Sequence, residues 1–217
     1  MSTRSVVLFG AMLIALALIV LVIGTSAKPA DAATTIVTKT FSNQGQILIP
    51  AGATPPSCLT GPTSGTAAPY PSQKSVGAFP RHSHIRDVNL TLKNYSHTYP
   101  DDVDVLLGHK GVNRTVMSDV GDSLDVNNIT LKLDDEASTP LPDETQIVAG
   151  SFKPTNFEAG DLFPVPAPIQ DNRSALSGFD GNNPLGTWNL FVQDDLLGDC
   201  GAFAAGWSIT IKAAVPS

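Results

Sequence analysis

The feature that most constrains this chain is a repeated alternation of apolar and polar residues. Successive side chains of a β-strand point to opposite faces, so such a segment predicts a strand with one buried and one wet face. Beyond the N-terminal segment, no window keeps apolar residues at the spacing of an amphipathic helix. The clearest alternating segments are 87–92, 103–107, 129–133, 188–193 and 207–211, with shorter candidates at 36–37 and 47–49.

Turn-forming residues separate these segments and indicate the fold class. Pro, Gly, Asn and Asp gather at 99–102, 182–184 and 197–199, where they favour tight connections. Many short strands joined in this way predict one all-β domain, an antiparallel β-sandwich or barrel. Two proline-containing stretches, 50–80 and 139–170, are predicted to be irregular. The second carries aromatic residues that we expect to fill one edge of the core, namely Phe152, Phe157 and Phe163.

The first 32 residues predict export. Arg4 precedes an uncharged apolar run from 6 to 23, and a small-x-small site follows at 30–32. These are the parts of a secretory signal peptide, which predicts a mature domain at 33–217. An uncleaved N-terminal anchor is the alternative, because an apolar run of 18 residues is close to the length that spans a bilayer. In either case we expect a protein that is secreted or held at the cell surface.

Charge and cysteine content narrow the choice of partners. Without residues 1–32, 11 Lys and Arg stand against 19 Asp and Glu, a net charge of −8. This acidity argues against binding to nucleic acid or anionic lipid, and it is compatible with binding of cations. Cys58 and Cys200 are the two cysteines of the chain. In an oxidising compartment such a pair favours a disulfide over two separate thiols.

Three acidic clusters are candidate cation sites. Crowded carboxylates repel each other unless a cation lies between them, and Ca²⁺ takes six to eight oxygen ligands from loops of this kind. Aspartate is also a routine turn residue, and no cluster has EF-hand spacing, so turn formation alone is the alternative. The candidate Ca²⁺ ligands are Asp101, Asp102 and Asp104 at the start of one strand, Asp134 and Asp135 after another, and Asp194, Asp195 and Asp199 around a hairpin.

Four sequence motifs follow one another in a recognisable order. "IRDVNLTL" at 85–92 precedes "HTYPDDVDVLL" at 97–107, and "NPLGTWNL" at 183–190 precedes "GWSITI" at 206–211. Together they resemble the P domain (P/Homo B domain) of subtilisin-like proprotein convertases, in the stand-alone form of bacterial exported proteins. The resemblance runs from about Phe41 to Lys212. It implies a jelly-roll-like β-sandwich with structural calcium in its loops.

The P-domain motifs occur here without a protease domain. The best available combination for a catalytic triad is His97 with Asp101 or Asp102 and a serine. The sequence around it carries no oxyanion-hole signature. We therefore expect a non-catalytic module with a structural or adhesive role at the cell surface or in an extracellular assembly, with a protein partner or with copies of itself. The alternatives are an accessory domain of a separately encoded subtilisin-like serine protease and an exported carbohydrate-binding protein.

Overall fold

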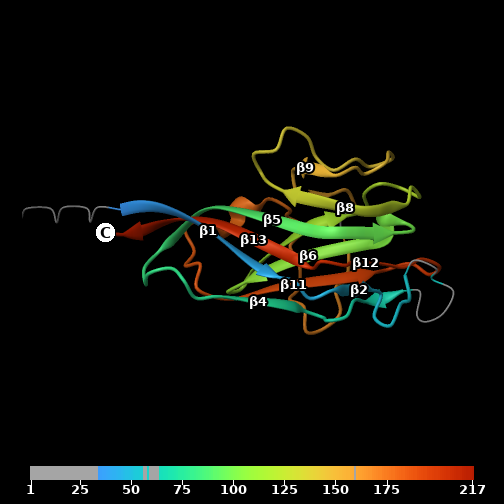
Figure 1. Ribbon diagram of the computed structural model, residues 1–217, viewed down its shortest axis with the longest axis horizontal. Helices are drawn as coiled ribbons and strands as arrows, with labels where there is room; N and C mark the ends of the chain where they lie inside the picture. The colour runs from blue at the N-terminus through green and yellow to red at the C-terminus, as the bar shows by residue number, and fades with distance from the viewer. Residues whose placement is uncertain (1–33, 56–57, 59–63, 159) are drawn as a thin grey trace, which may run out of the picture. The chain divides into compact units, whose positions relative to one another are not determined.

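A computed structural model describes residues 34–55, 58, 64–158 and 160–217 (Figure 1). The predicted signal peptide or anchor, residues 1–32, lies outside the described residues. Within them, no helix is long and apolar enough to cross a membrane. The regular structure of the described chain is almost all β-strand, with two short 3₁₀ turns, η1 (Pro100–Asp102) and η2 (Leu176–Phe179).

The first of two sheets is built around one long strand, β5. Within the described residues this sheet has seven strands in the order β1-β13-β5-β12-β2, with β8 pairing with β5 and β9 pairing with β8. All its pairs are antiparallel except β8 with β9. The strands are β1 (Thr34–Asn43), β2 (Ile47–Ile49), β5 (His84–His97), β8 (Val126–Leu133), β9 (Gly150–Phe152), β12 (Gly201–Phe203) and β13 (Trp207–Pro216).

The second sheet is centred on two antiparallel neighbours, β6 and β11. The described residues give it six strands in the order β10-β7-β6-β11-β3, with β4 also pairing with β11. The short β10 runs parallel to β7, and the other pairs are antiparallel. The strands are β3 (Gly65–Thr66), β4 (Ser72–Val76), β6 (Val103–His109), β7 (Val112–Ser118), β10 (Thr155–Asn156) and β11 (Gly186–Asp194).

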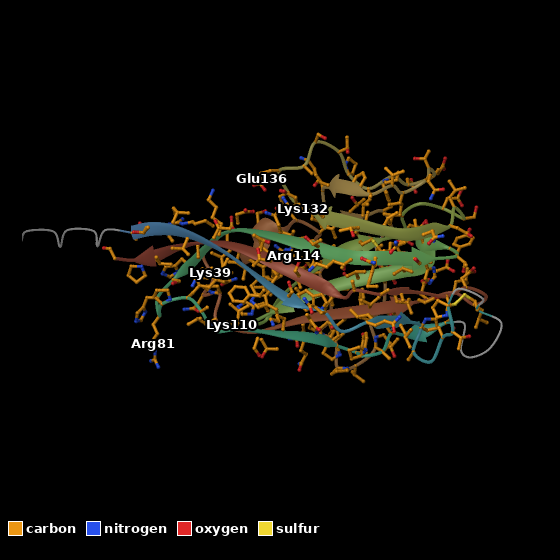
Figure 2. The ribbon with its side chains drawn as sticks, viewed as in Figure 1. Lys39, Arg81, Lys110, Arg114, Lys132 and Glu136 are labelled. Atoms are coloured by element: carbon orange, nitrogen blue, oxygen red, sulfur yellow. A yellow bond between two sulfur atoms is a disulfide. The ribbon has the colours of Figure 1, made fainter. Side chains whose placement is uncertain are left out.

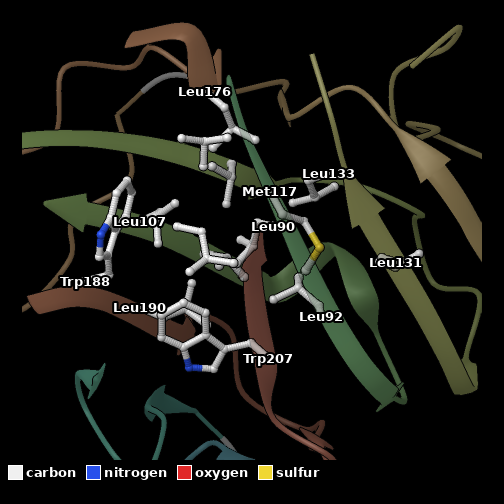
Figure 3. Packing of buried hydrophobic residues seen from close by; sticks show 14 of the residues in the cluster. Leu90, Leu92, Leu107, Met117, Leu131, Leu133, Leu176, Trp188, Leu190 and Trp207 are labelled. Atoms are coloured by element: carbon white, nitrogen blue, oxygen red, sulfur yellow. The ribbon is translucent and has the colours of Figure 1, made fainter. Parts of the chain in front are cut away.

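The two sheets bury their facing apolar residues in one cluster (Figure 3). Leu90 of β5, Leu107 of β6 and Leu190 of β11 are fully buried in it, as are both tryptophans. Each indole N–H has an acceptor, because Trp188 donates to the Pro184 carbonyl at 3.1 Å and Trp207 donates to a serine hydroxyl at 2.9 Å. Burying a large apolar side chain stabilises a fold by about 1.5 to 3 kcal/mol. The predicted β-sandwich is therefore confirmed.

The strand predictions were confirmed where the alternation is strong and were incomplete elsewhere. All five alternating segments lie in strands, namely β5, β6, β8, β11 and β13. Both segments predicted to be irregular contain short strands, namely β3 and β4 in segment 50–80 and β9 and β10 in segment 139–170. Of the aromatics expected at a core edge, Phe152 packs against the core, but the Phe157 side chain is 44% exposed. That part of the prediction was wrong because Phe157 follows β10, where the chain has left the sheet.

Cys58 and Cys200 form a disulfide, as predicted. Their Cα atoms lie 5.6 Å apart across a sequence separation of 142 residues, within the range that a disulfide spans. Cys200 directly precedes β12, so the bridge ties the long connection between β2 and β3 to the first sheet.

We predict that loss of this disulfide lowers stability substantially. Closing a loop of this length removes unfolded-state entropy worth about 4 to 5 kcal/mol on the chain-entropy model. Urea unfolding of the wild type and of the Cys58→Ser/Cys200→Ser variant, with intrinsic tryptophan fluorescence as the signal, measures the difference. The wild type under reducing conditions is the matched control. A variant that unfolds at the same urea concentration as the oxidised wild type would contradict the prediction.

Candidate metal centre

Antiparallel pairing brings three strand ends to one end of the sandwich. β6 begins at Val103 directly after η1, while its neighbours β7 and β11 run the opposite way and end at Ser118 and Asp194. The arrowhead of β5, which ends at His97, marks the same end in Figure 1. The acidic residues before β6, after β7 and after β11 are therefore neighbours in space. We call this region the acidic end.

Three carboxylates of the acidic end come close enough to share an ion. One oxygen from each of Asp104, Asp119 and Asp161 lies within 4.8 Å of the others. Asp104 belongs to β6, and Asp119 follows β7 with a left-handed backbone, φ 53°. Asp161 comes from the long connection after β10. We call these three residues the aspartate trio.

All three carboxylates converge on the hydroxyl of Ser118. Its Oγ lies 2.7 Å from Asp104 Oδ1, 2.8 Å from Asp119 Oδ2 and 2.8 Å from Asp161 Oδ2. A serine hydroxyl has one hydrogen, so it donates to only one of the three oxygens at a time. The other two face an oxygen lone pair and need either a proton of their own or a cation.

Burial makes the charge on Asp104 costly. Its side chain lies on the face of β6 opposite the core, beside Gln193, whose amide donates to Asp104 Oδ2 at 2.8 Å, and Asp104 is buried. Burial raises the pKa of Asp104 to about 8, against the hydrogen bonds from Gln193 and Ser118, with Asp161 and Asp195 raising it further. The pKa of Asp161 is also raised, by burial and then by Asp119 and Asp195.

A second group of acidic residues lies between the sheets at the same end. Asp194 is fully buried, and one of its oxygens lies 3.2 Å from His97 Nε2. The other ring nitrogen of His97 lies 2.8 Å from the Tyr99 carbonyl oxygen. Burial raises the pKa of Asp102 to about 7, with Asp194 as the next cause, and burial also raises the pKa of Asp194 against the lowering effect of His97.

Lysine and arginine do not neutralise this end of the sandwich. Within the described residues, the one ion pair formed by a carboxylate of the acidic end is that of Asp194 with His97. Lys39, Arg81 and Lys110 lie in the left half of Figure 2, away from the right-hand end at which β5 finishes. The field at the acidic end is therefore strongly negative and favours cations.

Two of the three predicted clusters meet at the acidic end. Asp101, Asp102 and Asp104 lie there together with Asp194, Asp195 and Asp199, although only Asp104 belongs to the aspartate trio.

The third predicted cluster lies elsewhere, because β8 runs from beside His97 to Leu133, away from the acidic end. Its two aspartates have other contacts. Asp134 pairs with Lys132, and Asp135 accepts backbone N–H groups of Leu176 and Ser177 at 2.9 and 2.7 Å.

Asp119 and Asp161 were missed by sequence reasoning. Asp119 follows β7, a strand without alternation because most of its residues are buried on both faces. Asp161 lies in a stretch with no periodicity, and only the fold brings it to Ser118. The one local signal is the Ser-Asp pair at 118–119, which is too common to identify a site.

Comparison with known proteins gives no further guide to this site. No protein-family model, no curated protein and no solved structure matches the chain.

We predict that the cation-free protein loses stability as pH rises from about 4 to about 8. Asp104 and Asp102 have raised pKa values in the folded state, about 8 and about 7, so the folded state binds more protons than the unfolded state across this range. Unfolding then becomes easier with increasing pH. Urea unfolding in a chelator at several pH values measures the slope.

Asp104→Asn should flatten this slope, because the amide stays neutral at every pH. Asp125→Asn, at an exposed position, is the matched control and should keep the wild-type slope. A cation-free protein whose stability rises between pH 4 and 8 would refute the assignment of buried, protonated carboxyls.

Proposed function

We propose that this chain is a non-catalytic, exported β-sandwich module with a structural or adhesive role at the cell surface or in an extracellular assembly, and that its acidic end holds a structural Ca²⁺ ion. The observation that carries the cation is the convergence of three carboxylate oxygens on the single hydroxyl of Ser118. The disulfide supports the extracellular setting, because such bridges persist in oxidising compartments.

The chemistry of the donor set fits a hard cation. Three carboxylates, those of Asp104, Asp119 and Asp161, offer oxygen ligands. When these carboxylates bind a cation, the Ser118 hydroxyl can turn its hydrogen away from them and offer its oxygen as a further ligand. Calcium prefers such oxygens and accepts irregular geometry, whereas zinc prefers histidine and cysteine. An ion held by these residues would join β6, the end of β7 and the connection after β10, which are separate in sequence.

The surroundings of His97 support a structural role for it. Nδ1 lies 2.8 Å from the Tyr99 carbonyl oxygen and 3.2 Å from the Tyr99 backbone nitrogen, and Nε2 lies 3.2 Å from Asp194, so structural contacts occupy both ring nitrogens. A general base needs one nitrogen with a free lone pair directed at a nucleophile. His97 is also buried between the sheets, where it links the end of β5 to the end of β11.

The resemblance to convertase P domains supports the same proposal. Its motifs lie on β5, β6, β11 and β13, the strands that build the centre of both sheets. A P-domain-like jelly roll would place this chain beside a protease as a stabilising domain. This role as an accessory domain of a subtilisin-like serine protease is the alternative to a free-standing structural module.

We predict that Ca²⁺ stabilises the protein and that Asp161→Asn removes the effect. A ligand that binds only the folded state at 100 times its dissociation constant adds about 2.7 kcal/mol. Thermal unfolding at pH 7.5, with Ca²⁺ or with a chelator, measures this gain. Asp143→Asn, which removes an exposed charge near Asp101 but outside the trio, should keep the gain. Equal stability with Ca²⁺ and with chelator would refute the calcium site.

Purifying the native protein from the cells that make it distinguishes the three candidate biological roles. A structural subunit should appear by light scattering as a large assembly without enzymatic activity. Co-purification with a peptidase would favour the protease-accessory role instead, and retention on a polysaccharide column would favour carbohydrate binding. The intact mass of the purified protein identifies its N-terminal residue, and we expect a chain that starts at Ala33. A monomer with none of these properties would refute the proposed role.

A further inference from the structure

An open depression of about 530 Å³ lies beside β7, on different residues from the acidic end. Arg114 of β7 lines it from one side, and the segment that leads into η2 lines it from the other. That segment supplies Arg173, Asn172 and Ser174, and η2 itself supplies Ser177 and Gly178. In a chain with an excess of acidic residues, two arginines at one depression are a notable concentration of positive charge.

Neighbouring backbone groups hold the guanidinium group of Arg114 in one position. Arg114 is 7% exposed, its Nε donates to the Ala175 carbonyl at 3.0 Å, and its Nη1 donates to the Asn113 carbonyl. Its plane lies directly against Gly178, where a Cβ would overlap the guanidinium atoms. The site therefore requires glycine at position 178, because the Cβ of an alanine there would displace the guanidinium group of Arg114.

Each arginine keeps one nitrogen for a ligand. Asp171 accepts from Nη1 of Arg114 at 3.3 Å and from Nε of Arg173 at 2.9 Å, and it forms an ion pair with Nη2 of Arg173 at 2.6 Å. Within the described residues, Nη2 of Arg114 and Nη1 of Arg173 make no hydrogen bond or ion pair. These two groups and the nearby hydroxyls are available to a molecule in the depression.

The charge balance of the depression selects the class of ligand. Partial burial acts to raise the pKa of Asp171, but the hydrogen bonds from Arg173 and the charge of Arg114 hold it below its ordinary value. The two guanidinium groups and the Asp171 carboxylate that pairs with them leave a net charge of +1, and Asp135, whose carboxylate accepts the backbone N–H groups of Leu176 and Ser177, lowers the positive charge near the depression further. A monoanion matches this charge, whereas a phosphate dianion meets the repulsion of Asp171 without a third cation to offset it. Ser174, Ser177 and Asn172 suit hydroxyl groups next to the anionic group.

We propose that this depression binds the carboxylate of a hydroxyl-rich molecule, a uronic acid sugar being the type of ligand. Arg114 and Arg173 bind the carboxylate, and the serine and asparagine side chains bind neighbouring hydroxyls. The site shares no residue with the aspartate trio. The proposal therefore does not depend on calcium, and the two can fail separately.

An NMR titration of the intact protein with sodium glucuronate at constant ionic strength tests this proposal. The signals to follow are the Nε–H group of Arg114 and the amides of Ser177 and Gly178. We expect saturable shifts with a millimolar dissociation constant, and no shifts with glucose. Arg173→Gln, at a side chain that is 71% exposed and safe for folding, should weaken binding at least fivefold. Arg81→Gln, an exposed arginine outside the depression, should leave it unchanged.

Gly178→Ala gives a second test, because its Cβ should displace the guanidinium group of Arg114 while both arginines stay in the chain. We expect it to weaken glucuronate binding as strongly as Arg173→Gln, with the circular dichroism of the wild type. The proposal is overturned if glucuronate does not saturate these signals, or if glucose shifts them equally. It also fails if Arg81→Gln costs as much affinity as Arg173→Gln, or if Gly178→Ala binds as the wild type does. Tighter binding of phosphate than of glucuronate would overturn the assignment of a carboxylate.

Discussion

The rest of the structure depends on the burial of one face of β5 against β6 and β11. Leu90 and Leu92 of β5 pack in the same cluster as Leu107 and Leu190 of the opposite sheet. A strand that slipped by one residue would turn these side chains outward, so this burial sets the register of both sheets. The register in turn decides where strands begin and end. The meeting of Asp104, Ser118 and Asp194 at one end is thus a consequence of apolar packing.

That packing creates an electrostatic cost at the acidic end. Isolated carboxylates in a low-dielectric site either take up protons or attract a cation, because water no longer screens their repulsion. The hydrogen bond from Gln193 and the shared hydroxyl of Ser118 fix the orientation of Asp104, but they do not supply positive charge. Protons and the proposed cation would therefore compete for the same oxygens, with proton binding favoured in acid and cation binding favoured as the carboxyls ionise.

The strands of this fold could be predicted because they alternate, and the acidic end could be predicted only in part. Asp104 and Asp194 lie on strands with clear alternation, so their neighbourhood follows from antiparallel pairing. β7 has no alternation, since Arg114 and Thr115 are as buried as Val116, and Asp119 behind it was therefore missed. Asp134 has the same local pattern as Asp101 but lies at the other end of its strand. Telling them apart requires strand direction, which is a property of the whole sheet.

Hydrogen bonds connect the disulfide to the acidic end. Thr98, directly after β5, donates its hydroxyl to Asp199 at 2.7 Å and accepts the Cys200 backbone N–H at 3.2 Å. Its own N–H donates to the Cys200 carbonyl oxygen at 3.3 Å. These hydrogen bonds hold the connection from β11 to β12 against the end of β5, where His97 meets Asp194, and the bridge to Cys58 ties the same connection to the segment after β2. A site of mutually repelling carboxylates tends to spread apart, and a covalent tie one residue from Asp199 opposes that spreading whether or not a cation is bound.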